Sequence, residues 1–548
     1  NVVTNKPSDT FEASLRTEFG SYFDFTGEAV VNIPITEKLA IRAVGYGEIS
    51  DGFVDAPFGD TEDSIGNENA GGRFSVRYTP TDRLTFDASV QVDRTAIDAP
   101  LFAIEETLLD GDPAILNGRI DELEIERINV VGEIQYDFDV GLLRSITAFN
   151  RTTFEGDEDF DFTPADATLL TRDNSDRAFS QEVRFESAVF SLPSGFGTIS
   201  ANGGFSYADI KGVLAQRFAA LGDDPGASVT DAETDITHVS AFGDVRWRPI
   251  DQLELAVGAR FSRDKVSFDR TVTRFGSFFR DPSISEGDRT FTAITPNASV
   301  LFDWTENLST YFSFSTGFRP GGFVGTSAGP SIEFDEENVR SFEGGLKSTW
   351  LDGQLTVNAS GYALFYNDIQ VPIARAFGGG VENAATARSV GAEITVGTTP
   401  VPGLNLQAGL GLAYAKFTDF EESISGDQTG ERLPRAPRTS FSFIGDYEHP
   451  SPIIADLQPF ARVEYSYRSD FSDAVGDTTT LDGYDVTNFR LGVRGERLEV
   501  ALFVENAFNE LYATEAFPGS GFEPDFAPQN LVVPGETRRF GVVTTVRF

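Results

Sequence analysis

Long segments of this chain alternate between apolar and polar residues, and this alternation limits the fold more than any other feature. In the clearest run, one face holds Leu84, Phe86, Ala88, Val90 and Val92, and the other holds Thr85, Asp87, Ser89, Gln91 and Asp93. Similar runs occur at residues 73–78, 308–315 and 488–494. A period of two predicts β-strands, because successive side chains of a strand point to opposite faces. Runs of about 9–14 residues are longer than the usual strand of about 5–6, and about 9–11 residues suffice for a tilted transmembrane strand.

Short and long connections alternate between these runs. Short links follow every other strand, at residues 36–38, 79–83, 249–252, 305–307, 351–353 and 400–403. Long polar, acidic segments that we expect to be loops lie between them, at residues 51–70, 94–127, 154–177, 208–234, 268–289, 318–337 and 509–534. Short turns at one end and long loops at the other are typical of an outer-membrane barrel. The sequence therefore predicts an all-β fold, a transmembrane antiparallel β-barrel of about 22 strands with short periplasmic turns, long extracellular loops and both termini on the short-turn side.

Aromatic residues with a polar edge occur at one end of the predicted strands. The positions immediately before short turns include Tyr78, Tyr136, Trp247, Trp304, Trp350 and Tyr447. Amphipathic rings favour the depth of the lipid headgroups, so this placement predicts a membrane girdle. The alternative is a general preference of aromatic residues for strand ends, but the clustering at one end favours the girdle.

Composition excludes several classes of function. The chain has 43 Lys and Arg against 85 Asp and Glu, a net charge of −42, so nucleic acid is not an expected partner. Zero Cys excludes thiolate chemistry, and two His leave little for a histidine metal site. A G-x-S-x-G pattern begins at Gly325, but Pro330 follows where the helix of a nucleophile elbow would begin. We therefore expect no enzymatic activity, no cofactor and no bound metal.

Several motifs, in their order along the chain, resemble those of TonB-dependent outer-membrane receptors of Gram-negative bacteria. They are YFSFSTGFRPGGF at 311–323, FEGGLK at 342–347, LPRAP at 433–437 and VENAF at 504–508. Phe548 matches the terminal aromatic assembly signal of outer-membrane barrels. Residues Asn1 to Pro7 resemble the point where the family's plug ends, so we expect residues 1–8 to be the end of a plug or a junction segment and residues 9–548 to be the barrel.

The resemblance implies an outer-membrane channel that imports a large, scarce nutrient. A ferric siderophore is the first expectation, followed by cobalamin, an oligosaccharide or an aromatic compound. The implied partners are the lipid bilayer and lipopolysaccharide, a plug domain and the inner-membrane TonB energising complex, together with the small-molecule or metal-chelate ligand. A barrel of this width needs a plug, and we find no plug or TonB-contacting segment in this sequence. The alternative is thus a barrel closed by a separate protein, acting as an ungated pore or as a surface scaffold or adhesin.

The expected outer loops contain the candidates for ligand binding. These are Phe102, Phe160, Phe162, Arg274, Phe278, Phe279, Arg280, Phe318, Arg319 and Phe323. Aromatic rings at a mouth can hold a planar or amphipathic ligand, and arginine supplies charge. The alternative is that the rings pack loop against loop and hold the shape of the vestibule. Arginines on the polar strand faces are expected to point into the lumen and to contact a plug or opposing carboxylates: Arg73, Arg77, Arg490, Arg494 and Arg547.

Overall fold

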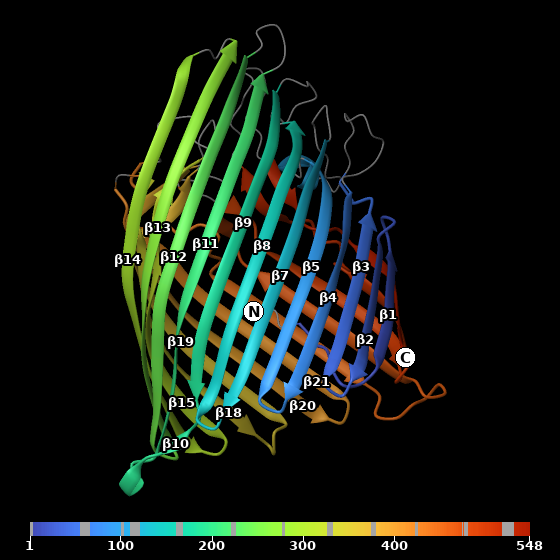
Figure 1. Cartoon of the computed structure of the whole chain (residues 1–548). Helices are drawn as coiled ribbons and strands as arrows, with labels where there is room; N and C mark the ends of the chain where they lie inside the picture. Colours follow the sequence, from blue (N-terminus) through green and yellow to red (C-terminus); the bar gives the residue numbers. More distant parts are fainter. Residues whose placement is uncertain are drawn as a thin grey trace.

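One antiparallel sheet closes on itself and forms a barrel, as Figure 1 shows for the computed structural model of the chain. The barrel closes because β1 (Glu12–Gly20) pairs on one side with β2 (Phe25–Thr36) and on the other with β30 (Arg539–Arg547). Among the described residues, 22 strands form the wall, which confirms the predicted architecture and strand number.

The other wall strands are β3 (Leu39–Ser50), β4 (Asn67–Thr81), β5 (Leu84–Ala99), β7 (Asp121–Phe138), β8 (Gly141–Asp159), β9 (Thr168–Ser187), β11 (Thr198–Ala220), β12 (Gly226–Ile250), β13 (Leu253–Gly276), β14 (Arg280–Thr305), β15 (Leu308–Arg319), β18 (Glu337–Trp350), β19 (Leu355–Ile373), β20 (Gly380–Val401), β21 (Leu404–Asp419), β22 (Thr439–Glu448), β23 (Gln458–Arg468), β26 (Tyr484–Arg494) and β27 (Leu498–Glu505). Shorter elements outside the wall are β6 (Ala103–Ile104), α1 (Glu105–Leu109), β10 (Phe190–Ser191), the 3-10 helix η1 (Pro193–Gly195), β16 (Gly322–Phe323), β17 (Glu333–Phe334), β24 (Phe471–Ser472), β25 (Thr480–Leu481), β28 (Ala513–Phe517) and β29 (Leu531–Pro534). The structure describes residues 4–54, 66–99, 103–109, 121–159, 168–220, 226–276, 280–325, 333–373, 380–421, 423, 426–473, 475, 480–517 and 531–548. Within these ranges, no helix has the length and apolar character needed to cross a membrane.

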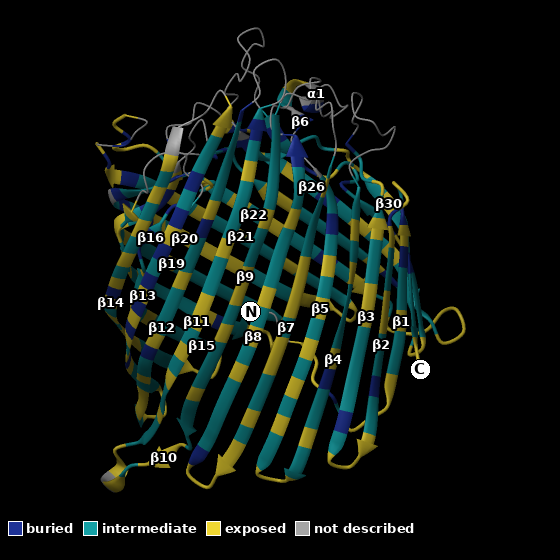
Figure 2. Ribbon diagram, turned by 45° about the horizontal axis from the view of Figure 1, so that its top comes forward, coloured by how far each residue is buried: buried dark blue, intermediate teal, exposed yellow. Residues whose placement is uncertain are grey.

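The two faces of each strand become the two surfaces of the barrel. On β4 and β5, Phe74 lies opposite Val90, and both side chains are exposed on the outside. On the other face of β5, Asp87 points into the lumen, where it binds Lys6 of the N-terminal segment. Exposed positions therefore recur along the wall strands in Figure 2. The apolar outer face suits lipid and the polar inner face suits water, as the alternation requires.

Four neighbouring strands, β11 to β14, contain between 23 and 26 residues each. The expectation that residues 208–234 and 268–289 are loops is wrong for most of these positions, because the strand ladders continue up to the pairs Ala220–Gly226 and Gly226–Gly276. Charged residues such as Lys211 and Glu233 occupy outward positions there next to apolar ones such as Val213, so the apolar and polar alternation no longer marks the strand. Hydrogen bonding between neighbouring strands nevertheless continues, since it does not depend on which side chains meet lipid.

Candidate functional site

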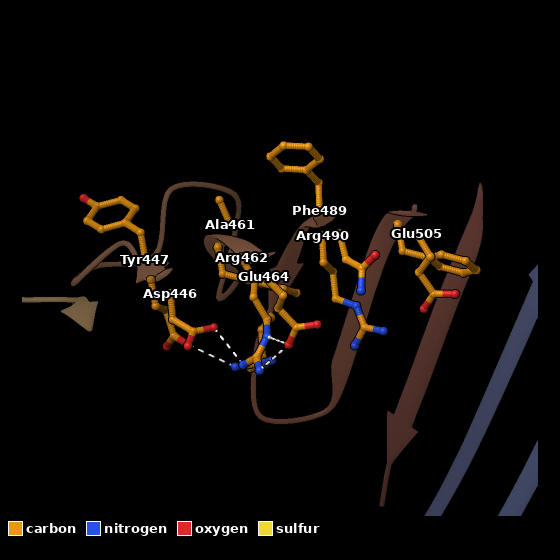
Figure 3. A pocket seen from close by; sticks show the side chains of 13 residues that line it. Asp446, Tyr447, Ala461, Arg462, Glu464, Phe489, Arg490 and Glu505 are labelled. Atoms are coloured by element: carbon orange, nitrogen blue, oxygen red, sulfur yellow. Dashed lines mark hydrogen bonds and ion pairs between the residues drawn. The ribbon is translucent and has the colours of Figure 1, made fainter. Parts of the chain in front are cut away.

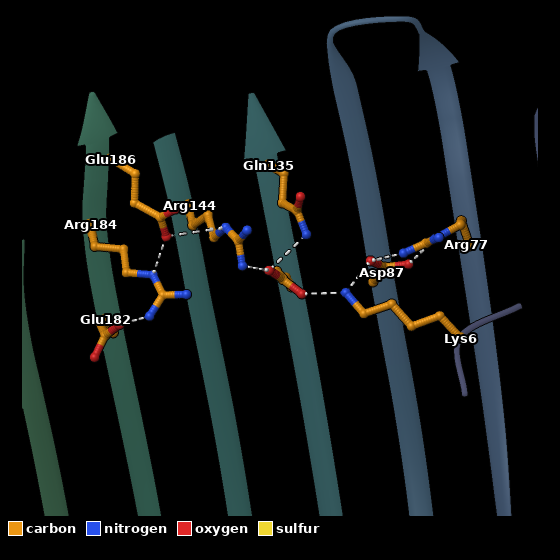
Figure 4. A network of polar contacts seen from close by, with 9 residues as sticks. Lys6, Arg77, Asp87, Gln135, Arg144, Glu182, Arg184 and Glu186 are labelled. Carbon is orange, nitrogen blue, oxygen red and sulfur yellow. Dashed lines mark hydrogen bonds and ion pairs between the residues drawn. The ribbon is translucent and has the colours of Figure 1, made fainter. Parts of the chain in front are cut away.

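The N-terminal segment lies inside the barrel and contacts its wall through Lys6 (Figures 1 and 4). The Lys6 Nζ atom is 2.8 Å from Asp87 Oδ2 and 2.8 Å from Glu133 Oε2. Burial lowers the pKa of Lys6, but hydrogen bonds to these two carboxylates outweigh burial and raise its pKa above 10.5. Arg77 also donates from Nε to Asp87 Oδ1 over 2.7 Å. Two wall strands thus hold the N-terminal segment by a charge-assisted contact.

The same wall carries further charges that alternate in sign, as Figure 4 shows. Arg144 lies between Glu133 and Glu186, at 3.8 and 3.7 Å. Arg184 lies 3.3 Å from Glu186 and 3.6 Å from Glu182. Elsewhere on the wall, the expected pairing of lumenal arginines with carboxylates also occurs: Arg494 with Glu448 and Glu499, and Arg547 with Glu499. The lumen is therefore lined by paired charges, which keep the path hydrophilic.

A cavity of about 290 Å³ opens on the lumenal wall where β22, β23, β26 and β27 meet. Arg462 binds Asp446 over 2.9 Å and Glu464 over 2.6 Å within it (Figure 3). Arg490 lines the same cavity, and among the described residues it has no carboxylate within 4.0 Å. Its guanidinium is available to an acidic group of a plug or of a passing solute.

Two aromatic rings pack against each other near the extracellular end of the wall. Phe323 stacks on Phe268 with ring centroids 5.1 Å apart and planes 6° from parallel. A Cβ atom at Gly287 would collide with the Phe323 ring in its present position, so a larger residue there would displace the ring. Beside it, Arg289 binds Glu333 and Asp335 over 3.1 and 2.6 Å. This part of the mouth thus contains two stacked rings and, beside them, the Arg289 guanidinium, whose charge is already paired with two carboxylates.

Loops far apart in sequence join above another part of the mouth. Strand β29 pairs with both β28 and β6, so the segments after β27 and after β5 form one small sheet. Val532 of this sheet meets Leu108 and Phe471 in a buried cluster. Arg435 binds Asp473 and Glu515 and ties two further segments to this sheet. These loops therefore behave as one folded cap rather than as independent chains.

The ligand-binding candidates fall into three groups. Five of them lie outside the described residues: Phe102, Phe160, Phe162, Phe278 and Phe279. Arg280 begins β14 opposite Arg274 at a bulge, and Arg319 is exposed at the end of β15. Phe318 continues the outward row of Phe312 and Phe314, away from the lumen, whereas Phe323 packs at the mouth. Their roles in ligand binding stay a prediction. Sequence reasoning missed Phe268 because it lies in a stretch that was expected to be a loop.

The six girdle candidates share one location. All are exposed and lie within the last four residues of wall strands, just before the short connections: Tyr78, Tyr136, Trp247, Trp304, Trp350 and Tyr447. Phe548 is exposed beside Ala13, with which its backbone forms two hydrogen bonds. Girdle and assembly roles fit these positions and stay predictions.

Comparisons with known proteins agree with this geometry. The family model "TonB dependent receptor-like, beta-barrel" matches residues 102–507. The ferric-pyoverdine 358 receptor of Pseudomonas putida is 26% identical over 275 residues, which cover 49% of this chain and 31% of that protein. The pesticin receptor of Yersinia pestis is 24% identical over 301 residues, or 53% of this chain and 41% of that protein. The matched part thus spans less than half the length of these curated relatives.

Solved structures show the same fold. The ferric yersiniabactin uptake receptor FyuA from Yersinia pestis superposes with a TM-score of 0.86 at 16% identity, over 100% of this chain and 82% of that one. The copper transporter OprC has a TM-score of 0.75 at 15% identity, over 100% of this chain and 81% of that one. At such low identity the likeness establishes the barrel fold alone.

Proposed function

Because this chain belongs to the TonB-dependent receptor family, we propose that it forms the route by which a ferric siderophore, or a similar metal chelate, crosses the outer membrane. The chain is an outer-membrane β-barrel, and its relatives are transport receptors rather than enzymes. The observation that carries the proposal is the match to receptors named for ferric-pyoverdine and, in Pseudomonas aeruginosa, for metal-pseudopaline. Cobalamin, oligosaccharides and aromatic compounds rank behind a metal chelate for this reason.

The geometry supports a two-stage passage. A chelate with aromatic or acidic groups would first meet the mouth, where Phe323 offers a ring and Arg319 an exposed cation. It would then pass along a wall on which charges are paired, as at Arg462 and Asp446, so that no single strong site holds it. A plug domain in the lumen and the TonB energising complex are the partners that the family implies for opening this path.

The experiment is growth under iron limitation. A strain that lacks its other siderophore receptors would express the full-length receptor and be offered a panel of ferric siderophores, one at a time. The proposal expects growth on at least one chelate and none when the energising complex is deleted. No growth on any chelate, together with growth on a non-metal nutrient that the strain otherwise cannot import, would contradict it. Swelling of protein-loaded liposomes in small sugars would instead support an ungated pore.

A further inference from the structure

The connection between β9 and β11 differs chemically from most other short connections of the barrel. Residues 188–197 have the sequence AVFSLPSGFG and contain no charged residue, whereas other short connections contain Glu37, Asp82 or Asp352. The segment includes β10 and η1, and it extends past the short-turn ends of the neighbouring strands in Figures 1 and 2. We call residues 188–197 the apolar hairpin.

The large apolar side chains of the apolar hairpin are exposed. Val189 and Phe196 expose 70% and 62% of their surfaces, and Phe190 is exposed as well. The backbone closes the turn, because the Leu192 amide donates to the Gly197 carbonyl over 2.8 Å and Gly197 has a φ of 79°, which glycine adopts without strain. A closed turn thus keeps three large apolar side chains at its surface, where transfer into an apolar phase would be favourable.

The apolar hairpin continues the outward surface of the wall. Phe190 lies opposite Ile199, and Ile199 lies opposite Trp247, which shares its face of β12 with the exposed Val245. Residues directly opposite each other on neighbouring strands lie on the same face, so Phe190 lies on the face of the girdle candidate Trp247. The Trp247 Nε1 atom also donates to the Phe196 carbonyl over 2.9 Å, which ties the second arm of the hairpin to the wall. The hairpin and the girdle therefore form one continuous surface.

Strand geometry limits how far the apolar hairpin reaches beyond the row of Phe190 and Trp247. Its tip begins at Pro193, three residues past Phe190 along the chain. Three residues of strand are about 10 Å long, which is about 7 Å along the membrane normal at a tilt of about 45°. The polar layer of each leaflet is about 5–7 Å thick, since a bilayer of about 40–45 Å has a hydrocarbon core of about 30 Å. A hairpin that starts at the depth of the girdle therefore ends within the headgroup layer.

We propose that the apolar hairpin lies in the headgroup layer of the inner leaflet and inserts Val189, Phe190 and Phe196 among phospholipid chains, so that it anchors this side of the barrel. Lipid is the occupant of this surface because the hairpin is continuous with the outward face of the wall and carries no charge for an acidic or basic partner to pair with. The hairpin lies outside the lumen, so this inference does not depend on the import function.

The test places a spin label on a single cysteine, which is specific because the chain has no native Cys. Val189→Cys labels the apolar hairpin, and Glu37→Cys labels an exposed turn on the same side of the barrel. The full chain is reconstituted in phosphatidylcholine vesicles. Collisions of each label are measured with oxygen, which concentrates in the bilayer, and with a neutral nickel chelate, which stays in water. The proposal expects the ratio of oxygen to nickel collisions to be roughly threefold or more higher at Val189→Cys than at Glu37→Cys.

Two double variants, each labelled at position 189, test the aromatic rings. Phe190→Asn with Phe196→Asn makes the hairpin polar, so its collision ratio should fall to about that of the label at position 37. Phe23→Asn with Phe508→Asn removes two exposed rings at the opposite end of the barrel and should leave the ratio unchanged. Heat-dependent gel mobility shows that each barrel is folded.

Equal collision ratios at positions 189 and 37 in the otherwise native chain would overturn the proposal and make the hairpin an arm in water. An unchanged ratio in a folded chain with Phe190→Asn and Phe196→Asn would overturn it too. So would a broadened spectrum of the label at position 189 that sharpens when labelled chain is diluted with unlabelled chain, because it would assign this surface to contact between two copies.

Discussion

Lys6 is the residue that fastens the N-terminal segment to the lumenal wall. Its ammonium group bridges Asp87 and Glu133 on two neighbouring strands at 2.8 Å each. Lys6→Met keeps the length of the side chain and removes the charge, so we expect the backbone of residues 4–11 to exchange its amide hydrogens faster, by roughly tenfold. Lys38→Met, in a short turn, is the matched control and should leave that exchange unchanged. Equal protection in all three proteins would show that Lys6 does not hold the segment.

The charge of Lys6 also gives a pH dependence with a definite sign. Its pKa in the folded protein lies above the ordinary 10.5, so the contact stabilises the segment fully below pH 10.5 and is lost as the pH rises through the folded-state pKa. Exchange protection of residues 4–11 should accordingly persist to alkaline pH in the native chain. In Lys6→Met it should show no such alkaline transition after correction for intrinsic exchange.

Phe323 is the described ligand candidate that packs at the mouth. Phe323→Ala removes its stack with Phe268, and we expect the affinity for an imported chelate to fall by roughly fivefold to tenfold, with no change in barrel unfolding. Phe190→Ala, on the exposed periplasmic hairpin, should leave the affinity unchanged. An unchanged affinity in Phe323→Ala would assign the ring to loop packing alone, which is the alternative reading of these aromatics.

At the scale of elements, the barrel closes at a seam that depends on Arg539. This residue of β30 binds Glu18 of β1 over 3.3 Å, Glu505 of β27 over 2.8 Å, and Asp24 in the turn after β1. Glu18 and Asp24 are buried. Arg539→Gln leaves Asp24 and Glu505 without their cation and leaves Glu18 with Arg16 alone, so we expect the free energy of unfolding to fall by about 2 kcal/mol or more.

Urea unfolding in lipid vesicles measures this change. Arg497→Gln, in the exposed turn before β27, is the control and should lie within about 0.5 kcal/mol of the native chain. A loss in Arg539→Gln no larger than in the control would mean that backbone pairing alone holds the seam.

The sequence predicts most of the wall but only part of the site. Runs such as Leu84–Val92 were predicted as strands because one face meets lipid and the other meets water, so composition alternates. The upper parts of β11 to β14 were missed because their outward residues, such as Glu233 and Asp235, do not face lipid. Phe268 was missed with them, since its contact with Phe323 joins positions 55 residues apart and leaves no local pattern.

At the scale of the whole molecule, 22 strands enclose a lumen that their own side chains do not fill. The charges on its wall are largely paired, and the N-terminal segment lies within it. Such a barrel acts as a selective route only if something in the lumen controls passage, which is the role that the family gives to its plug. Selective import by this barrel therefore requires that passage be coupled to energy.

The most direct test is uptake of radioactive iron, supplied as the chelate that supports growth, by cells that express the full-length receptor. For a gated importer we expect accumulation that saturates with chelate concentration and stops when the proton gradient is collapsed, while surface binding of the chelate persists. Uptake that continues without the gradient, or that rises linearly without saturation, would contradict a gated importer and indicate an open pore.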